Sequence, residues 1–279
     1  MEEWSVVHKV ALWGFLGAFL FGIIAHKTHF CTMGAISDWI NMGSLVRLRA
    51  WLLAMAVALL VSQLLQAIGW IDLSASIYLS PNLGIGGHIV GGLLFGVGMT
   101  LGGGCGQRTL VRAGGGNLKS LVVLLVLGLT AYITLRGLLA GVRIEVFGPL
   151  SIELSEYALA DQSLASVLAA MSGLAPESVQ KGLAVIIGLA LLIYTLKDKD
   201  FRTSGEAIVS GLSVGLLVAG AWFVTGVVGN DDFDPIRLET LTFIAPVGNM
   251  LNYLMTWTGS TIGFGIAVVF GVLGGSLVY

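Results

Sequence analysis

The sequence predicts an all-α integral membrane protein: a helical bundle built from an inverted repeat, with short re-entrant or half helices. Hydrophobic residues make up 56% of the 279 residues and charged residues 11%, and the mean hydropathy is +0.92. A soluble domain carries about 25% charged residues. Glycine is abundant, with 40 residues, and proline is scarce, with 5, as in membrane helices that pack closely or break at glycine.

Apolar runs of about 20 residues, the length that crosses a bilayer, lie near 6–25, 47–69, 117–139, 182–197, 206–228 and 260–279. Shorter apolar stretches lie near 29–41, 86–101 and 241–257, and polar or glycine residues interrupt them. Backbone without helical bonding is tolerated at membrane depth only inside protein or along a wet cavity. We therefore expect the short stretches to form half-helices or re-entrant loops.

Charge predicts the orientation. The basic residues that group between spans on one side are Lys27, Arg47, Arg49, Arg108, Arg112, Lys119, Lys197, Lys199 and Arg202. The acids that fall on the other side include Glu2, Glu3, Glu145, Glu153, Asp232, Asp234 and Glu239. The positive-inside rule makes the basic side cytoplasmic and the N-terminus external. The net charge of −2 offers no case for a nucleic-acid partner.

A weak internal repeat divides the chain. Under this orientation the spans 6–25 and 206–228 cross in opposite directions, and each is followed by a short apolar piece and a full span. Phe30 aligns with Phe243 and, after one gap, Gly34 aligns with Gly248. This pattern indicates an inverted repeat, which transporters use to build a midplane site.

We therefore expect a first membrane repeat at 1–140 containing both cysteines, an external connector at 141–181, and a second, inverted repeat at 182–279. In the connector, apolar residues recur at helical spacing from Leu154 to Met171. This spacing predicts one amphipathic helix that rests on the membrane surface or caps the bundle.

The stretch "GGGCGQ" places Cys105 between Gly104 and Gly106, with Gln107 next. Glycine permits a close backbone approach, and a helix start exposes N–H groups that attract anions. A thiol is a weak donor and a weak acceptor, so it can contact a sulfur-bearing anion without trapping it. The alternative is that Cys105 is a packing residue and the glycines serve helix contacts.

For several other residues the sequence leaves two roles open. Cys31 opens a short apolar piece and is either a pore residue or buried packing. Gln107 and Asn249 either line a path or satisfy the backbone of a broken helix. Arg108 is either an interfacial residue or a group that draws an anion inward. A metal site at His26, His29 and Cys31 is disfavoured because Lys27 sits among them, and we expect neither a metal nor a cofactor.

The segments "HFCTMGAISD" and "GGLLFGVGMTLGGGCGQRTLVRAGGGNLKSL" resemble signatures of the YeeE/YedE sulfur-transport family. "GAWFVTGVVGNDDFDPIRLETLTFIAPVGNMLNYLMTWTG" is similar to that family's second half. The resemblance implies a multi-pass transporter of the bacterial inner membrane that imports thiosulfate. It also implies that cysteines at a constriction contact the terminal sulfur through S–H···S hydrogen bonds, and the matching residues are Cys31 and Cys105. Beyond membrane lipid, the implied partner is a small cytoplasmic sulfur-carrier protein.

The chain departs from the family pattern in its second half. That half normally closes with another glycine–cysteine–glycine loop and a further span, and no counterpart of residues 86–139 is present. We therefore expect the second repeat to be incomplete here and to lack a third cysteine.

Several other functions stay open. The chain could be a transporter or channel for another small anion or for a selenium or sulfur compound, or a structural membrane subunit. An intramembrane thiol enzyme is disfavoured because no histidine or carboxylate lies near Cys105 in sequence to form the thiolate. We expect no enzymatic activity. Asp38 is the one carboxylate that we consider for proton coupling.

Overall fold

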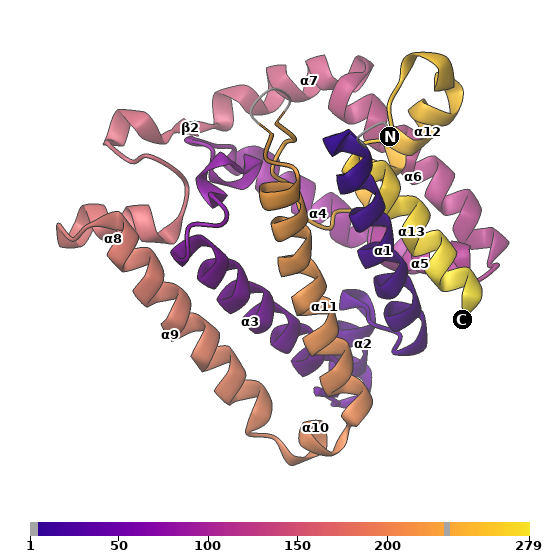
Figure 1. Cartoon of the computed structure of the whole chain (residues 1–279), viewed down its shortest axis with the longest axis horizontal. Coiled ribbons are helices and arrows are strands. Elements are labelled where there is room, and N and C mark those ends of the chain that lie inside the picture. Colours follow the sequence, from indigo (N-terminus) through magenta and orange to yellow (C-terminus); the bar gives the residue numbers. More distant parts are fainter. Residues whose placement is uncertain (1–4, 232–234) are drawn as a thin grey trace.

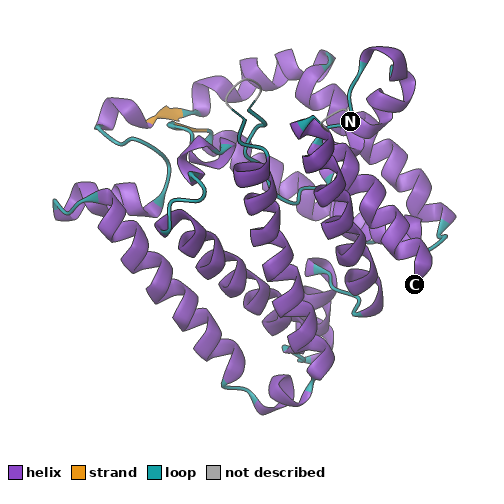
Figure 2. Ribbon diagram, in the orientation of Figure 1, coloured by secondary structure: helices purple, strands orange, loops and turns teal. Residues whose placement is uncertain are grey.

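The computed structural model describes residues 5–231 and 235–279 of the chain. Helices form most of the described residues (Figures 1 and 2). Six helical segments in this part of the chain are long and apolar enough to cross a membrane, which confirms the all-α membrane class. The acids Glu2, Glu3, Asp232 and Asp234, used for the orientation, lie outside the described residues.

The α-helices are α1 (Val6–Lys27), α2 (Thr32–Met42), α3 (Val46–Ala67), α4 (Ile85–Leu101), α5 (Gly106–Gly114), α6 (Leu118–Arg136), α7 (Leu138–Phe147), α8 (Leu164–Ser172), α9 (Pro176–Leu196), α10 (Lys199–Thr203), α11 (Gly205–Phe223), α12 (Ile244–Met255) and α13 (Phe264–Val278). Single 3₁₀ turns are η1 (Leu73–Ala75), η2 (Ile77–Leu79), η3 (Gly148–Leu150), η4 (Leu154–Tyr157) and η6 (Trp257–Gly259). A π-helical turn, η5 (Val224–Val228), extends α11. Strands β1 (Asn82–Leu83) and β2 (Ile152–Glu153) pair antiparallel.

The short apolar stretches form short helices, as the sequence predicts. These are α2, α4 and α12, and α5 follows α4 after a glycine break. Four of the long spans fall where hydropathy places them. The span expected at 260–279 is the 15-residue helix α13, which is not among the six candidate spans, and the sixth candidate is α4 together with α5 (Ile85–Gly114). Helix α9 begins at Pro176 rather than near 182. Its first turn holds Glu177 and Lys181, which form an i,i+4 ion pair, so a hydropathy window leaves that turn out.

The connector differs from the single surface helix that the sequence predicts. It contains α7, the turn η4 and the nine-residue helix α8. Ala158 takes a left-handed conformation, with φ of 58°, and the Ser163 side chain caps the start of α8. The expectation of one helix from Leu154 to Met171 is therefore wrong, because these local turns break it.

Two helix pairs pack with their backbones in close approach. Helix α1 lies beside α13 (Figure 1), where a methyl group added at Gly22 would meet the Val272 carbonyl oxygen at 2.5 Å. Helix α3 lies along α11, where a methyl group added at Gly211 would meet the Ala50 carbonyl oxygen at 2.7 Å. Glycine makes both approaches possible, as in other membrane helix pairs.

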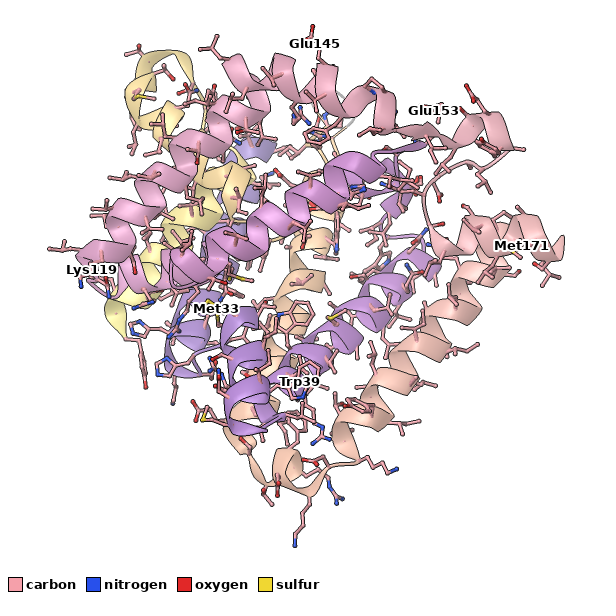
Figure 3. All side chains as sticks on the ribbon, turned by 180° about the vertical axis from the view of Figure 1, so that it is seen from behind. Met33, Trp39, Lys119, Glu145, Glu153 and Met171 are labelled. Atoms are coloured by element: carbon pink, nitrogen blue, oxygen red, sulfur yellow. The ribbon has the colours of Figure 1, made fainter. Side chains whose placement is uncertain are left out.

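The main core gathers where α1, α5, α12 and α13 meet, around side chains such as Phe21, Leu110, Val247 and Val268. Many large apolar side chains on the outside of the bundle remain exposed, among them Leu93, Leu94 and Val122. Lipid rather than water is the solvent that such a surface requires. In Figure 3, Glu145 and Glu153 lie along the upper edge of the molecule and Lys119 lies well below them.

Candidate functional site

Two cysteines that are far apart in sequence meet inside the bundle. Cys31 is the N-cap residue of α2 and Cys105 the N-cap residue of α5. Their thiols lie close enough to influence each other, and both are free rather than disulfide-bonded. The structure thus brings together the two candidate sulfur contacts.

Local backbone geometry positions the first thiol. His29 adopts a left-handed conformation, with φ of 52°, a region that histidine enters more readily than most residues. The chain thereby turns from α1 into an extended Cys31, with φ of −161°. The Gly34 N–H donates to the Cys31 sulfur at 3.5 Å, so the thiol caps its own helix.

The second thiol follows the glycine loop. Helix α4 ends at Leu101, and Gly103 takes a φ of 70° that favours glycine. Helix α5 then starts at Gly106, directly after Cys105. Neighbouring side chains also leave little room for a larger residue in this loop. A methyl group at Gly104 would lie 3.0 Å from the Arg108 side chain, and one at Gly106 would lie 3.0 Å from the Ile244 side chain.

Gln107 joins the two cysteine loops. The Cys105 thiol donates to the Gln107 side-chain oxygen across 3.9 Å, and the Gln107 amide donates to the Phe30 carbonyl oxygen at 3.2 Å. Phe30 directly precedes Cys31. Gln107 therefore satisfies backbone at the helix break and also lines a cavity, which unites the two roles that the sequence leaves open.

Helix N-termini surround the thiol pair. The first turns of α2 and α5 both start at the cysteines, and α12 starts at Ile244, which packs against Gly106. The first N–H groups of a helix lack intrahelical partners and carry partial positive charge. The site therefore offers an anion both dipoles and two soft sulfur atoms.

Three cavities among the described residues reach the thiol pair, two through Cys105 and one through Cys31. The largest has a volume of about 980 Å³. We call it the outer cavity. Cys105, Gln107 and Asn249 line it, together with Arg136 at the end of α6 and Arg237. Asn249 lies on α12.

The smallest of these three cavities has a volume of about 270 Å³, and we call it the inner cavity. Its lining includes His29, Cys31, Arg47 and Glu206. The Arg47 guanidinium pairs with Asp38 at 3.1 Å and donates to the His29 carbonyl oxygen. Cys105 thus lines the outer cavity and Cys31 the inner cavity.

The remaining predicted residues lie close to the loops but bond elsewhere. Arg108 approaches the His29 ring at 3.5 Å, and Arg112 donates to the Gly103 carbonyl oxygen at 3.1 Å. His26 turns away and bonds the Ser276 carbonyl oxygen at 2.9 Å. Within the described residues no group of three or more His, Cys, Asp or Glu side chains is placed to hold a metal ion.

Glu239 was not expected at a site and lies in the outer cavity. It belongs to the connector between η5 and α12, outside the spanning helices, and this connector folds back along α11. The Thr225 hydroxyl donates to the Glu239 carbonyl oxygen at 2.7 Å, and Thr240 donates to the Val218 carbonyl oxygen at 2.9 Å. Burial raises the pKa of Glu239 above the ordinary glutamate value, and Arg237 opposes that rise in part.

Asp38, the carboxylate singled out from the sequence, has a different environment. It forms the ion pair with Arg47 beside the inner cavity. Glu239 is the acid that faces the outer cavity, and its place just ahead of the short apolar stretch 241–257 was the one available signal.

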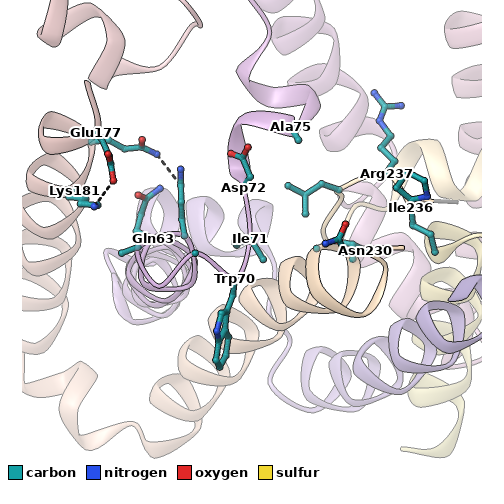
Figure 4. A pocket seen from close by; sticks show the side chains of 18 residues that line it. Gln63, Trp70, Ile71, Asp72, Ala75, Glu177, Lys181, Asn230, Ile236 and Arg237 are labelled. Carbon is teal, nitrogen blue, oxygen red and sulfur yellow. Dashed lines mark hydrogen bonds and ion pairs between the residues drawn. The ribbon is translucent and has the colours of Figure 1, made fainter. Parts of the chain in front are cut away.

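A separate recess of about 730 Å³ lies between the end of α3, the start of α9 and the η5–α12 connector. Figure 4 shows Glu177 and Lys181 paired on one side of it and Arg237 on the other. Arg237 and Leu238 line both this recess and the outer cavity. Neither cysteine lines it.

Comparison with known proteins gives consistent matches. A family model described as sulphur transport matches residues 27–279. The thiosulfate transporter TsuA of Spirochaeta thermophila is 29% identical over 219 residues, covering 76% of this chain and 62% of that protein. The thiosulfate transporter TsuA of Escherichia coli is 25% identical over 290 residues, covering 97% of this chain and 74% of that protein.

Proposed function

Because the chain belongs to the sulphur-transport family, we propose that it is a multi-pass inner-membrane transporter that imports thiosulfate. The observation that carries the proposal is the closeness of the Cys31 and Cys105 thiols, of which Cys105 lines the outer cavity and Cys31 the inner cavity. Membership of a transport family favours passage of the anion over its chemical conversion.

The proposed path starts in the outer cavity, where Arg136 and Arg237 attract the anion. At the thiol pair the anion loses water and meets the N–H groups of α2 and α5. The terminal sulfur of thiosulfate accepts weak S–H hydrogen bonds, first from Cys105 and then from Cys31. The inner cavity with Arg47 receives it on the other side.

Weak contacts suit passage. A charged hydrogen bond contributes about 1.5–3 kcal/mol, and a ring of such bonds would hold the anion against release. Thiols donate more weakly, so they lower the barrier for a sulfur-terminated anion without creating a deep well. They also favour that anion over sulfate, whose oxygen atoms are harder acceptors.

Import must also work against the membrane potential. Moving one charge across 100 mV takes about 2.3 kcal/mol, so a dianion entering a negative interior requires about 4.6 kcal/mol per 100 mV. The proposed transporter therefore needs a co-transported cation or a sink for the anion. A small cytoplasmic sulfur-carrier protein, implied by the family resemblance, is the sink that we propose, and the basic residues Arg112 and Lys119 favour its docking.

The test is uptake of labelled thiosulfate into proteoliposomes, with sulfate, sulfite and selenite as competitors. We expect Cys105→Ala to abolish uptake and Cys31→Ala to reduce it strongly, at least roughly fivefold for each kcal/mol lost at the barrier. Cys105→Ser keeps a donor of similar size but not the sulfur, so it should fail as well. Ser62→Ala, which removes a buried polar group of α3 outside both cavities, is the matched control and should transport normally.

Transport at the normal rate by Cys105→Ser would refute the sulfur-specific path and leave Cys105 as a packing residue. If the wild-type protein carries sulfate or selenite in preference to thiosulfate, the substrate assignment is wrong. Insertion and folding of each variant are checked by size-exclusion chromatography, because thiol removal should scarcely affect stability.

A further inference from the structure

Glu239 occupies a defined position beside the entry route. Both its backbone groups are held by one side chain: the Thr225 hydroxyl donates to the Glu239 carbonyl oxygen at 2.7 Å and accepts from the Glu239 N–H at 3.3 Å. Thr225 is 1% exposed and lies in the π-helical turn η5. Such turns recur at functional sites, and this one fixes where the carboxylate projects.

The outer cavity surrounds this carboxylate with groups from several elements. The titratable or charged residues that line it are Tyr78 of η2, Cys105 of α5, Arg136 of α6, Arg237 of the same connector, and Tyr253 of α12. Burial raises the pKa of Glu239 and Arg237 opposes the rise. Burial, and secondly the nearby Glu239, raise the pKa of Tyr78. The cavity thus combines two cationic side chains with one half-buried carboxylate.

An anion that enters this cavity changes the balance. It neutralises the field of Arg237 and adds negative charge close to Glu239, and both changes favour the protonated carboxyl group. We propose that Glu239 is a proton-binding site that takes up one proton when thiosulfate enters the outer cavity, so that the anion and a proton are bound together. This inference rests on the proposed function.

The consequence for transport follows from charge. A proton bound with the anion lowers by one the net negative charge that gathers in the outer cavity, and Glu239 releases the proton to the water of that cavity when the anion moves on. Asp38 is unsuited to this role because its carboxylate already pairs with Arg47. The outward-facing acid Glu145 lines neither cavity.

The test is calorimetric titration of the purified full chain with thiosulfate, across a pH series and in two buffers with different ionisation enthalpies. The difference between buffers gives the number of protons taken up. Between the pKa values of Glu239 in the free and anion-bound protein, we expect about one proton per anion and a tenfold fall in affinity for each unit rise in pH. Below that window both states are protonated, and above it neither is, so the pH dependence disappears on each side.

The variants assign the site. Glu239→Gln should bind thiosulfate with no buffer dependence and a flat pH profile, whereas Glu239→Asp should retain proton uptake. Glu145→Gln is the matched control and should behave as the wild type. If Glu239→Gln does not fold, the wild-type and Glu239→Asp titrations still test the proton site. The shorter carboxylate of Glu239→Asp must shift the pH range in which thiosulfate binding takes up a proton.

The outcomes separate the two proposals. If the wild-type protein does not bind thiosulfate at all, the proposed function fails. If it binds with no proton uptake at any pH, or if Glu239→Gln still takes up a proton, the proton site is refuted and the proposed function stands. A dependence on sodium instead of pH would likewise refute the proton site.

Discussion

At the scale of single residues, Gln107 has the most connected role. Its amide bonds the Phe30 carbonyl oxygen, and its oxygen accepts from Cys105. The sequence could place Gln107 beside Cys105 but not beside Phe30, because that contact spans 77 positions. Only the packed helices determine which backbone carbonyl the amide reaches.

We predict that Gln107→Leu lowers thiosulfate uptake roughly tenfold, because it leaves the Phe30 carbonyl oxygen unsatisfied and loosens the link between the two cysteine loops. Gln107→Glu should be worse, since it also adds negative charge on the path of an anion. Gln180→Leu, which removes an amide bond to Gln66 in the separate recess, is the control and should transport normally. Equal uptake by the Leu and Glu variants would contradict the placement of an anion beside this residue.

Glu239 shows what residue patterns miss. In the sequence it is one of several acids between a span and a short apolar stretch, and its charge places it outside the membrane. The fold-back of the connector depends on hydroxyl contacts of Thr225 and Thr240 with backbone atoms of distant positions. Such side-chain-to-backbone bonds leave no periodic signal.

At the scale of elements, hydropathy and glycine content predicted most of the helices. These two signals missed the start of α9, where an ion pair makes the helix polar. They also missed the helix boundaries in the connector, where the left-handed Ala158 ends one helical turn and Ser163 caps the start of α8. The cysteine loops were predicted because glycine density and helix breaks are visible in sequence. Their meeting was expected from family resemblance and not from spacing.

Glycines within one helix should differ sharply in tolerance. A methyl group at Gly211 would meet the Ala50 carbonyl oxygen at 2.7 Å and the Leu53 side chain at 3.0 Å, whereas one at Gly220 would meet nothing within 4 Å. We predict that Gly211→Ala destabilises the protein by about 1–3 kcal/mol through overpacking of α3 against α11. Gly220→Ala on the same helix should be neutral or stabilising, by up to about 1 kcal/mol.

Thermal unfolding of the detergent-solubilised variants, followed by the loss of monodisperse protein, makes this comparison. Equal melting temperatures for the two variants would contradict the close approach of α3 and α11.

At the scale of the whole molecule, the two close helix pairs support the inverted repeat. The repeat alignment makes α1 equivalent to α11 and α3 equivalent to α13. Under that equivalence the α1–α13 and α3–α11 contacts are the same contact made twice. The proposed division into repeats at 1–140 and 182–279 rests on this pairing.

Orientation belongs to the same scale. We predict that a cysteine introduced by Thr203→Cys, at the exposed end of α10, resists an impermeant maleimide in intact cells, because the basic residues beside it stay in the cytoplasm. Ser155→Cys in the connector should label readily. Both are made in a background with Cys31→Ser and Cys105→Ser. The opposite labelling pattern would reverse the topology and, with it, the proposed direction of transport.

The nesting of the two helix pairs also has a consequence for assembly during synthesis. Helix α3 can find α11 once the middle of the chain has been inserted, but α1 must wait for α13, from which most of the chain separates it. Contacts between such distant segments form late and slowly. The face of α1 that packs on α13 is therefore exposed to lipid while the rest of the chain is synthesised. Slow insertion of α13 prolongs this stage, in which α1 can pair with the wrong helix.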